Sequence, residues 1–192
     1  MKIRSLSTPL LALAALLALP LAAQATVYQF NATINAAQEV GASSSTASGL
    51  ASLSYDDMGT LAVGDDSYSF TMGVSGLSGA PTGFHIHGPA AIGVNGPVRV
   101  DLAAAPFFSA SGGGFLTVFG SGVVPASFGA MSMKDALMGN LAYVNVHTAA
   151  DPGGAVRGQL LLVAVVPEPS SYALLLGGLG LVGFVARRRR SL

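Results

Sequence analysis

The sequence predicts an all-β protein, an antiparallel sandwich or barrel of about eight short strands. Along residues 26–166, apolar and polar residues alternate in short runs, and a period of two is typical of half-buried strands. Glycine-rich segments separate these runs and suit tight connections. The stretch of about 140 residues has the usual size of a single domain with one core.

The alternation predicts strands at 28–34, 61–63, 68–74 and 98–102. Shorter apolar runs predict further strands at 50–55, 83–87, 115–119, 141–147 and 155–165. Between two of these strands, the segment Gly64-Asp65-Asp66-Ser67 predicts a hairpin connection, because glycine and aspartate tolerate turn conformations.

Two segments break the strand pattern. Residues 41–49 are rich in serine and lack apolar periodicity, so they are predicted to form a solvated loop. Ser132 is a candidate helix N-cap, with Asp135 three residues later and Gly139 as a stop. One short helix is predicted there.

The first 25 residues have the order of a cleavable signal peptide. Lys2 and Arg4 form a positive end, an apolar run covers 9–23, and small residues surround a cut near residue 25. The apolar run is short for a membrane span, which disfavours the alternative of a permanent anchor. We expect the exported chain to begin near Thr26.

Residues 167–192 carry a second sorting pattern. Pro167, Glu168 and Pro169 precede an apolar segment, 172–186, that is predicted to be a helix. A basic cluster then closes the chain and favours a cytoplasmic end; it consists of Arg187, Arg188, Arg189 and Arg190. As a helix, the apolar segment reaches about 22 Å, against about 30 Å for a hydrocarbon core, so it is a marginal transmembrane helix.

This order closely resembles the PEP-CTERM sorting signal of Gram-negative bacteria. The resemblance implies that an exosortase, a membrane peptidase, removes the segment, often in bacteria that make extracellular polysaccharide. It also implies a chain that is exported, held transiently at the inner membrane, and then released to the cell surface or the extracellular space. A permanent C-terminal anchor is the alternative, and both interpretations place residues 26–166 outside the cytoplasm.

The predicted domain, residues 26–166, is acidic and lacks cysteine. Its three basic and eight acidic residues give a net charge of −5, which argues against a nucleic-acid partner. Without cysteine there are no disulfides or thiolate metal sites, so packing alone must hold the core. Nucleophile elbows and phosphate-binding glycine loops are also missing from the sequence, so hydrolase and nucleotide-binding functions have little support.

The candidate chemistry lies in the three histidines, His85, His87 and His147. In a strand, His85 and His87 share one face, and their apolar neighbours point to the other. His147 lies on the outward face of its own strand, so the three imidazoles converge if the two strands are neighbours. Such a cluster suits copper, zinc, iron or nickel. The alternative is structural, with imidazoles bonded to backbone carbonyls or to carboxylates such as Asp101 and Asp151.

Several blocks, in order, resemble the chordin domain, abbreviated CHRD, over nearly all of residues 27–162. The most specific are His-Ile-His-Gly-Pro-Ala at 85–90 and Tyr-Val-Asn-Val-His-Thr at 143–148. The resemblance implies an immunoglobulin-like, Greek-key β fold. In animal chordin the domain occurs in an extracellular protein that binds growth factors, and the bacterial versions have no settled activity.

A second similarity is to the β-barrel of copper/zinc superoxide dismutases, in which a Phe-His-Val-His strand and a later Val-His strand supply copper ligands. By this similarity His85, His87 and His147 are the metal-binding residues, and Arg157 takes the place of an arginine that guides anions. The chain lacks the further histidine that copper and zinc would share, the remaining zinc site and a cysteine pair.

Two functional hypotheses result. The leading one is an exported binding protein of the cell surface or extracellular matrix, which contacts polysaccharide or a surface protein and has no catalytic activity. The rival is a metalloprotein with copper or zinc at the three histidines, a metal-dependent oxidoreductase in which Arg157 contacts an anion or partner. The alternative for Arg99 and Arg157 is a structural role, in which they pair with acidic residues across the sheet.

Overall fold

The computed structural model describes residues 25–62, 64–125, 127–167 and 169–190. All of the predicted signal peptide except its last residue lies outside this part. Within it the chain forms ten strands: β1 (Thr26–Asn35), β2 (Ser48–Asp56), β3 (Ser67–Ser75), β4 (Pro81–His87), β5 (Val98–Asp101), β6 (Phe108–Gly112), β7 (Phe115–Val123), β8 (Tyr143–Thr148), β9 (Val156–Gln159) and β10 (Leu161–Pro167).

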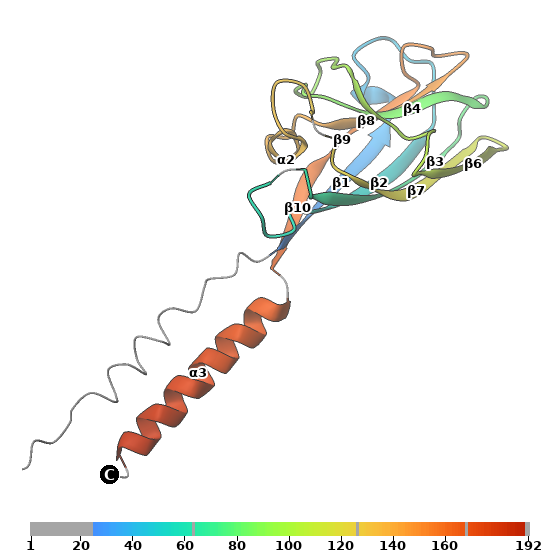
Figure 1. Cartoon of the computed structure of the whole chain (residues 1–192). Helices are drawn as coiled ribbons and strands as arrows, with labels where there is room; N and C mark the ends of the chain where they lie inside the picture. Colours follow the sequence, from blue (N-terminus) through green and yellow to red (C-terminus); the bar gives the residue numbers. More distant parts are fainter. Residues whose placement is uncertain (1–24, 63, 126, 168, 191–192) are drawn as a thin grey trace, which may run out of the picture.

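All ten strands belong to one antiparallel sheet (Figure 1), with a short 3-10 helix, η1 (Ala36–Gln38), after β1. The strand order is β5-β4-β8-β9-β1-β2-β3-β7-β6, and β10 pairs with β1. The all-β, antiparallel fold that the sequence predicts is confirmed.

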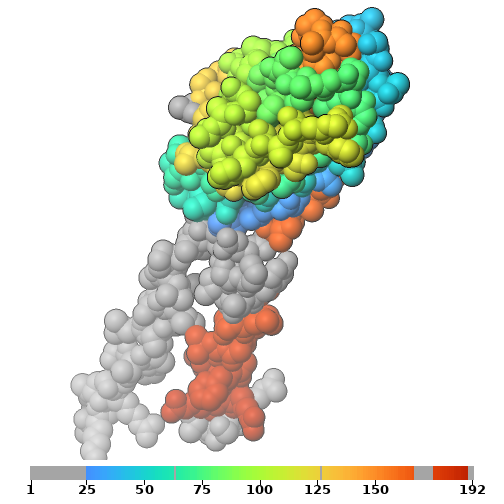
Figure 2. All heavy atoms as spheres, turned by 90° about the vertical axis from the view of Figure 1, so that its right-hand side faces the viewer, coloured from blue at the N-terminus to red at the C-terminus, as the bar shows by residue number. Residues whose placement is uncertain are grey.

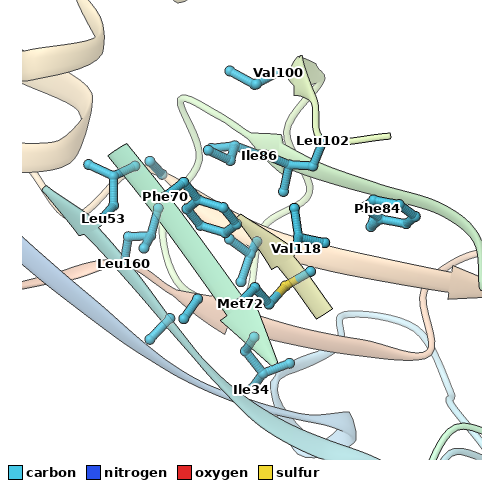
Figure 3. Packing of buried hydrophobic residues seen from close by; sticks show 14 of the residues in the cluster. Ile34, Leu53, Phe70, Met72, Phe84, Ile86, Val100, Leu102, Val118 and Leu160 are labelled. Carbon is cyan, nitrogen blue, oxygen red and sulfur yellow. The ribbon is translucent and has the colours of Figure 1, made fainter. Parts of the chain in front are cut away.

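The sheet curls so that its two halves share one core. On β3, Tyr68, Phe70, Met72 and Val74 are buried while the residues between them are exposed, which is the period-two pattern of the sequence. Figure 3 shows residues of both halves, such as Ile86 of β4 and Phe70 of β3, in a single cluster. Packing on the inner face leaves the alternate side chains of β3 exposed on the outer face, whereas on β9 both faces are buried.

The strand predicted at 61–63 is wrong. Residues 57–66 connect β2 to β3, and the chain turns at Met58 and Gly59, whose φ angles are 50° and 70°. Leu61 is 104% exposed, and Val63 lies outside the described residues. Two alternating apolar residues are too few to anchor a strand, so the hairpin connection is longer than the predicted turn at 64–67.

The last predicted strand, 155–165, is two strands. β9 lies between β8 and β1, whereas β10 pairs with β1, and the buried Leu160 separates the two strands. β6 was not predicted at all, because its sequence Phe-Ser-Ala-Ser-Gly holds only one large apolar residue. All five of its residues are exposed at the edge of the sheet, beside β7.

The short helix predicted after Ser132 is confirmed as α2 (Met133–Met138). The Ser132 side chain accepts a hydrogen bond from the backbone N–H of Asp135, and Gly139 is the C-cap. Met133, Ala136 and Leu137 are buried, so the helix covers part of the core.

The helix predicted near the C-terminus is α3 (Pro169–Arg190), which includes the arginine cluster and projects away from the sheet (Figure 1). Its described side chains, from residue 175 to 189, are exposed. Among the described residues, we found no helix with the length and apolar content needed to span a membrane.

Candidate metal centre

The pairing of β4 with β8 brings the three histidines together. In the register of this pair, Gly83 lies opposite His147, His85 opposite Asn145, and His87 opposite Tyr143. Each histidine can offer one ring nitrogen, and these three atoms all lie within 4.8 Å of one another. The structure therefore places the histidines as the strand periodicity predicts.

Backbone carbonyls orient two of the three imidazoles. The Nδ1 atom of His87 lies 2.9 Å from the carbonyl oxygen of Gly96, and Nδ1 of His147 lies 3.0 Å from that of Pro152. A carbonyl only accepts, so Nδ1 of each ring must donate the proton. This leaves the lone pair on Nε2, which is the tautomer that a metal ion requires.

Two buried ring nitrogens of the cluster have no hydrogen-bond partner. They are Nδ1 of His85 and Nε2 of His87. A buried polar atom without a partner costs about 1–3 kcal/mol, so native proteins usually satisfy such atoms. An ion bound between the rings would satisfy the Nε2 atom of His87.

Burial and mutual proximity favour the neutral form of two of the imidazoles. Burial lowers the pKa of His85, the nearby His147 lowers it further, and Asp101 acts in the opposite direction. Burial also lowers the pKa of His87, where the Gly96 carbonyl opposes the shift and His85, His147 and Arg157 add to it. Because metal ions bind neutral imidazole, these shifts favour binding at neutral pH.

The distances also set a condition on binding. Ligand atoms about 2.0 Å from a tetrahedral metal ion are about 3.3 Å from one another, which is closer than the widest separation here. The most widely separated ring nitrogens must therefore approach one another by up to about 1.5 Å. His85 is suited to this movement, since its Nδ1 makes no hydrogen bond.

Tyr143 supports the ring of His87 in two ways. The two rings stack, with centroids 4.9 Å apart and an interplanar angle of 12°. The Tyr143 hydroxyl also accepts a hydrogen bond from the N–H of Gly96 at 3.0 Å and donates to its carbonyl at 3.2 Å. Tyr143 thus fixes the carbonyl that orients His87.

Arg157, predicted as an anion or partner contact, is only 1% exposed. Its guanidinium lies 3.5 Å from the centre of the Tyr143 ring and donates to the carbonyls of Val94 and Ala91 at 3.0 and 3.3 Å, and to Gln159. Burial lowers its pKa, which Tyr143 and Glu39 oppose. Its observed role is to hold the loop of residues 88–97 against the sheet.

Neither acidic residue considered as a partner hydrogen-bonds to the histidines in the described part of the chain. Asp101 lies opposite His85 in the β4–β5 pair, and its carboxylate accepts a hydrogen bond from the N–H of Ala103 at 2.9 Å. Asp151 accepts hydrogen bonds from the N–H and hydroxyl of Ser44, at 2.8 and 3.1 Å. Arg99, for which pairing with an acidic residue was the structural alternative, instead donates a hydrogen bond to the carbonyl of Gly88 at 2.7 Å. Of the two structural partners considered for the histidines, backbone carbonyls are the ones observed.

Gly83 is a residue of the centre that sequence reasoning missed. A Cβ atom at this position would lie 2.8 Å from Cε1 of His85 and 3.4 Å from its Nε2. The glycine therefore makes room for the His85 ring beside His147. The available signal was its position two residues before His85, on the same face of the strand.

Comparison with known families gives two matches. The family described as CHRD domain matches residues 30–160, and the PEP-CTERM protein-sorting motif matches residues 165–190. No curated protein and no solved structure matches the chain.

Proposed function

The chain belongs to the CHRD domain family and carries a PEP-CTERM sorting motif, and from this premise we propose that it is an exported binding protein whose domain holds a copper or zinc ion at His85, His87 and His147. The observation that carries the proposal is the convergence of three imidazoles, one of which has a buried and unpartnered Nε2 atom. Its role is binding, without catalysis.

The sorting motif supports export along the exosortase route to the cell surface. In this proposal, the C-terminal segment is held transiently at the inner membrane of a Gram-negative cell until an exosortase-type peptidase acts on it. The domain then remains at the surface or in the extracellular matrix.

Copper and zinc are favoured over other metal ions by the donor set. Three imidazoles without a carboxylate or thiolate ligand suit borderline metal ions, and affinities among divalent ions are highest near copper and zinc. Three protein ligands also leave one position for water or a small ligand, as in open zinc sites.

Metal analysis of the protein tests this proposal. The full chain, exported by its own signals and purified without a metal-binding tag, should contain about one copper or zinc ion. His87→Ala should lose the ion, whereas Ser69→Ala, on the exposed side of β3, should retain it. A wild-type chain that takes up neither ion after dialysis against each salt would contradict the proposal.

A second candidate function is contact with extracellular polysaccharide or a surface protein. The observation that favours it is an uncovered face on the half of the sheet that is remote from the histidines, where two adjoining hollows of about 620 and 670 Å³ lie along β1, β2, β3 and β7. Loss of binding by variants of this face, with the metal content unchanged, would separate the two functions.

A further inference from the structure

The outward face of β1, β2, β3 and β7 presents regular rows of side chains. One row consists of Asn31, Ser52, Thr71 and Phe119, which are paired in register across the four strands. Successive rows are about 6.8 Å apart along the strands, and neighbouring positions in a row are about 4.8 Å apart. The face is therefore an ordered array in which hydroxyl and amide groups alternate with apolar side chains such as Leu50 and Phe119.

This array is free of charge. The residues that line its two hollows include serine, threonine, asparagine, leucine and phenylalanine, but no acidic or basic residue. The net charge of −5 on the domain is therefore carried by residues outside this lining. An uncharged lining offers no attraction to nucleic acid or to an anionic polymer, whereas hydroxyl and amide groups both donate and accept hydrogen bonds.

Three exposed phenylalanines border the array on β6 and β7. Phe119, Phe108 and Phe115 are 53%, 67% and 62% exposed. The rings of Phe108 and Phe119 stack, with centroids 5.6 Å apart and an interplanar angle of 22°. Figure 2 shows β6 and β7, in yellow-green, on the side turned to the viewer. Flat apolar rings beside hydroxyl groups match the two kinds of surface on a sugar ring, its C–H face and its hydroxyl edge.

Gly73 leaves an open space in the middle of the array. It lines both hollows, and a Cβ atom added to it would meet no atom within 4 Å. Packing of this domain does not require a glycine there. Since glycine weakens a strand, the open space is consistent with close approach of a ligand to the backbone.

We infer that this face binds a neutral polysaccharide, with sugar rings stacked on the phenylalanines and sugar hydroxyls bonded to the rows of serine, threonine and asparagine. The inference deepens the second candidate function and is independent of the metal centre. The ligand is an uncharged sugar polymer. A charged polymer would find no opposite charge on this face, and an apolar protein surface would leave its hydroxyl and amide groups without hydrogen-bond partners.

Affinity electrophoresis of the full chain tests the inference. Native gels that contain dextran or hydroxyethyl cellulose should retard the wild-type protein, and gels that contain alginate, an anionic polymer, should not. Gly73→Tyr fills the open space with a residue favoured in strands, so it should abolish retardation without lowering the melting temperature. Phe119→Ser should weaken retardation roughly tenfold.

The metal centre supplies the matched control. His87→Ala should be retarded like the wild type, and Gly73→Tyr should keep the metal content of the wild type. Equal mobility of the wild type with and without both neutral polymers would overturn the inference, as would retardation by alginate alone. A wild-type chain that sediments as a dimer, and becomes monomeric in Gly73→Tyr, would also overturn it, since the face would then bind a second copy.

Discussion

At the residue scale, a glycine controls the space around the metal-binding imidazoles. Gly83 lies opposite His147 in the β4–β8 pair, and its missing side chain leaves room for the ring of His85. The position has no positive φ angle that would itself demand glycine. The role of Gly83 is therefore steric, and it can be tested by adding a single methyl group at this position.

Gly83→Ala should weaken metal binding roughly tenfold, or about 1.4 kcal/mol, because the new methyl group lies within 2.8 Å of Cε1 of His85 and displaces the ring. Gly73→Ala is the control, since it adds the same group to a strand glycine in open space. Titration with zinc, followed by calorimetry, measures both. Equal affinities in the two variants would show that Gly83 does not shape the site.

Tyr143→Phe should lower the free energy of unfolding by about 1 kcal/mol and weaken metal binding as well. The substitution keeps the ring that stacks on His87 but removes both hydrogen bonds to Gly96. Gly96 then holds the Nδ1 proton of His87 less firmly. Thermal unfolding with and without zinc separates the two effects, and an unchanged stabilisation by zinc would argue against this positioning role.

The histidines were predictable because a strand alternates its side chains with a fixed period, so His85, His87 and His147 had to face outward. Their hydrogen-bond acceptors were not predictable. Gly96 and Pro152 lie in loops, where no periodicity relates sequence to direction. The burial of Arg157 was missed for a similar reason, since the loop that covers it is remote in sequence.

At the element scale, Asp57 ties three segments together. Its carboxylate accepts hydrogen bonds from the N–H of Thr26 at 2.7 Å, from the N–H of Gly59 at 3.1 Å, and from Lys134 of α2 at 2.9 Å. It thus joins the start of β1, the β2–β3 connection and the helix. This loop was misjudged from sequence because its hydrogen bonds, rather than apolar contacts, order it.

Asp57→Asn should lower the free energy of unfolding at pH 7 by about 1.5 kcal/mol. Burial alone would raise the pKa of Asp57, but the bonds from Lys134, Thr26 and Gly59 lower it below the usual 3.8. The stabilisation is therefore complete above pH 3.8 and is lost as the pH falls further. The difference between variant and wild type should shrink below that pH in urea titrations.

Asp65→Asn is the control for this pH dependence. Asp65 lies in the same loop, but its carboxylate accepts hydrogen bonds from the exposed Thr60 within the loop. The substitution should change the free energy of unfolding by less than about 0.5 kcal/mol. A loss as large as that of Asp57→Asn would mean that loop charge, rather than the links to β1 and α2, sets the stability.

At the scale of the whole molecule, the first and last strands of the described domain place their outer ends together. Thr26 on β1 lies opposite Pro167 on β10, so the described chain enters and leaves the sheet side by side (Figure 1). The strand order behind this arrangement was not predictable, because β1 pairs not only with the next strand, β2, but also with β9 and β10 from the other end of the domain's sequence. Local patterns carry no information on such pairings.

Processing near Pro167 should release a complete domain. The last strand ends at Pro167 and α3 begins at Pro169, so a cut there removes the helix and leaves the sheet intact. Mass spectrometry of the protein from cells with an exosortase should find a C-terminus near residue 167, with an unchanged melting temperature. A mass that ends at Leu192 would contradict processing.

X-ray absorption at the zinc edge of the zinc-loaded full chain tests the metal-binding proposal most directly. The account predicts three imidazole nitrogens at about 2.0–2.1 Å and one further light ligand. His87→Ala should reduce the number of imidazoles to two. A first shell made of oxygen atoms, or an imidazole count that the substitution does not change, would contradict a centre built from His85, His87 and His147.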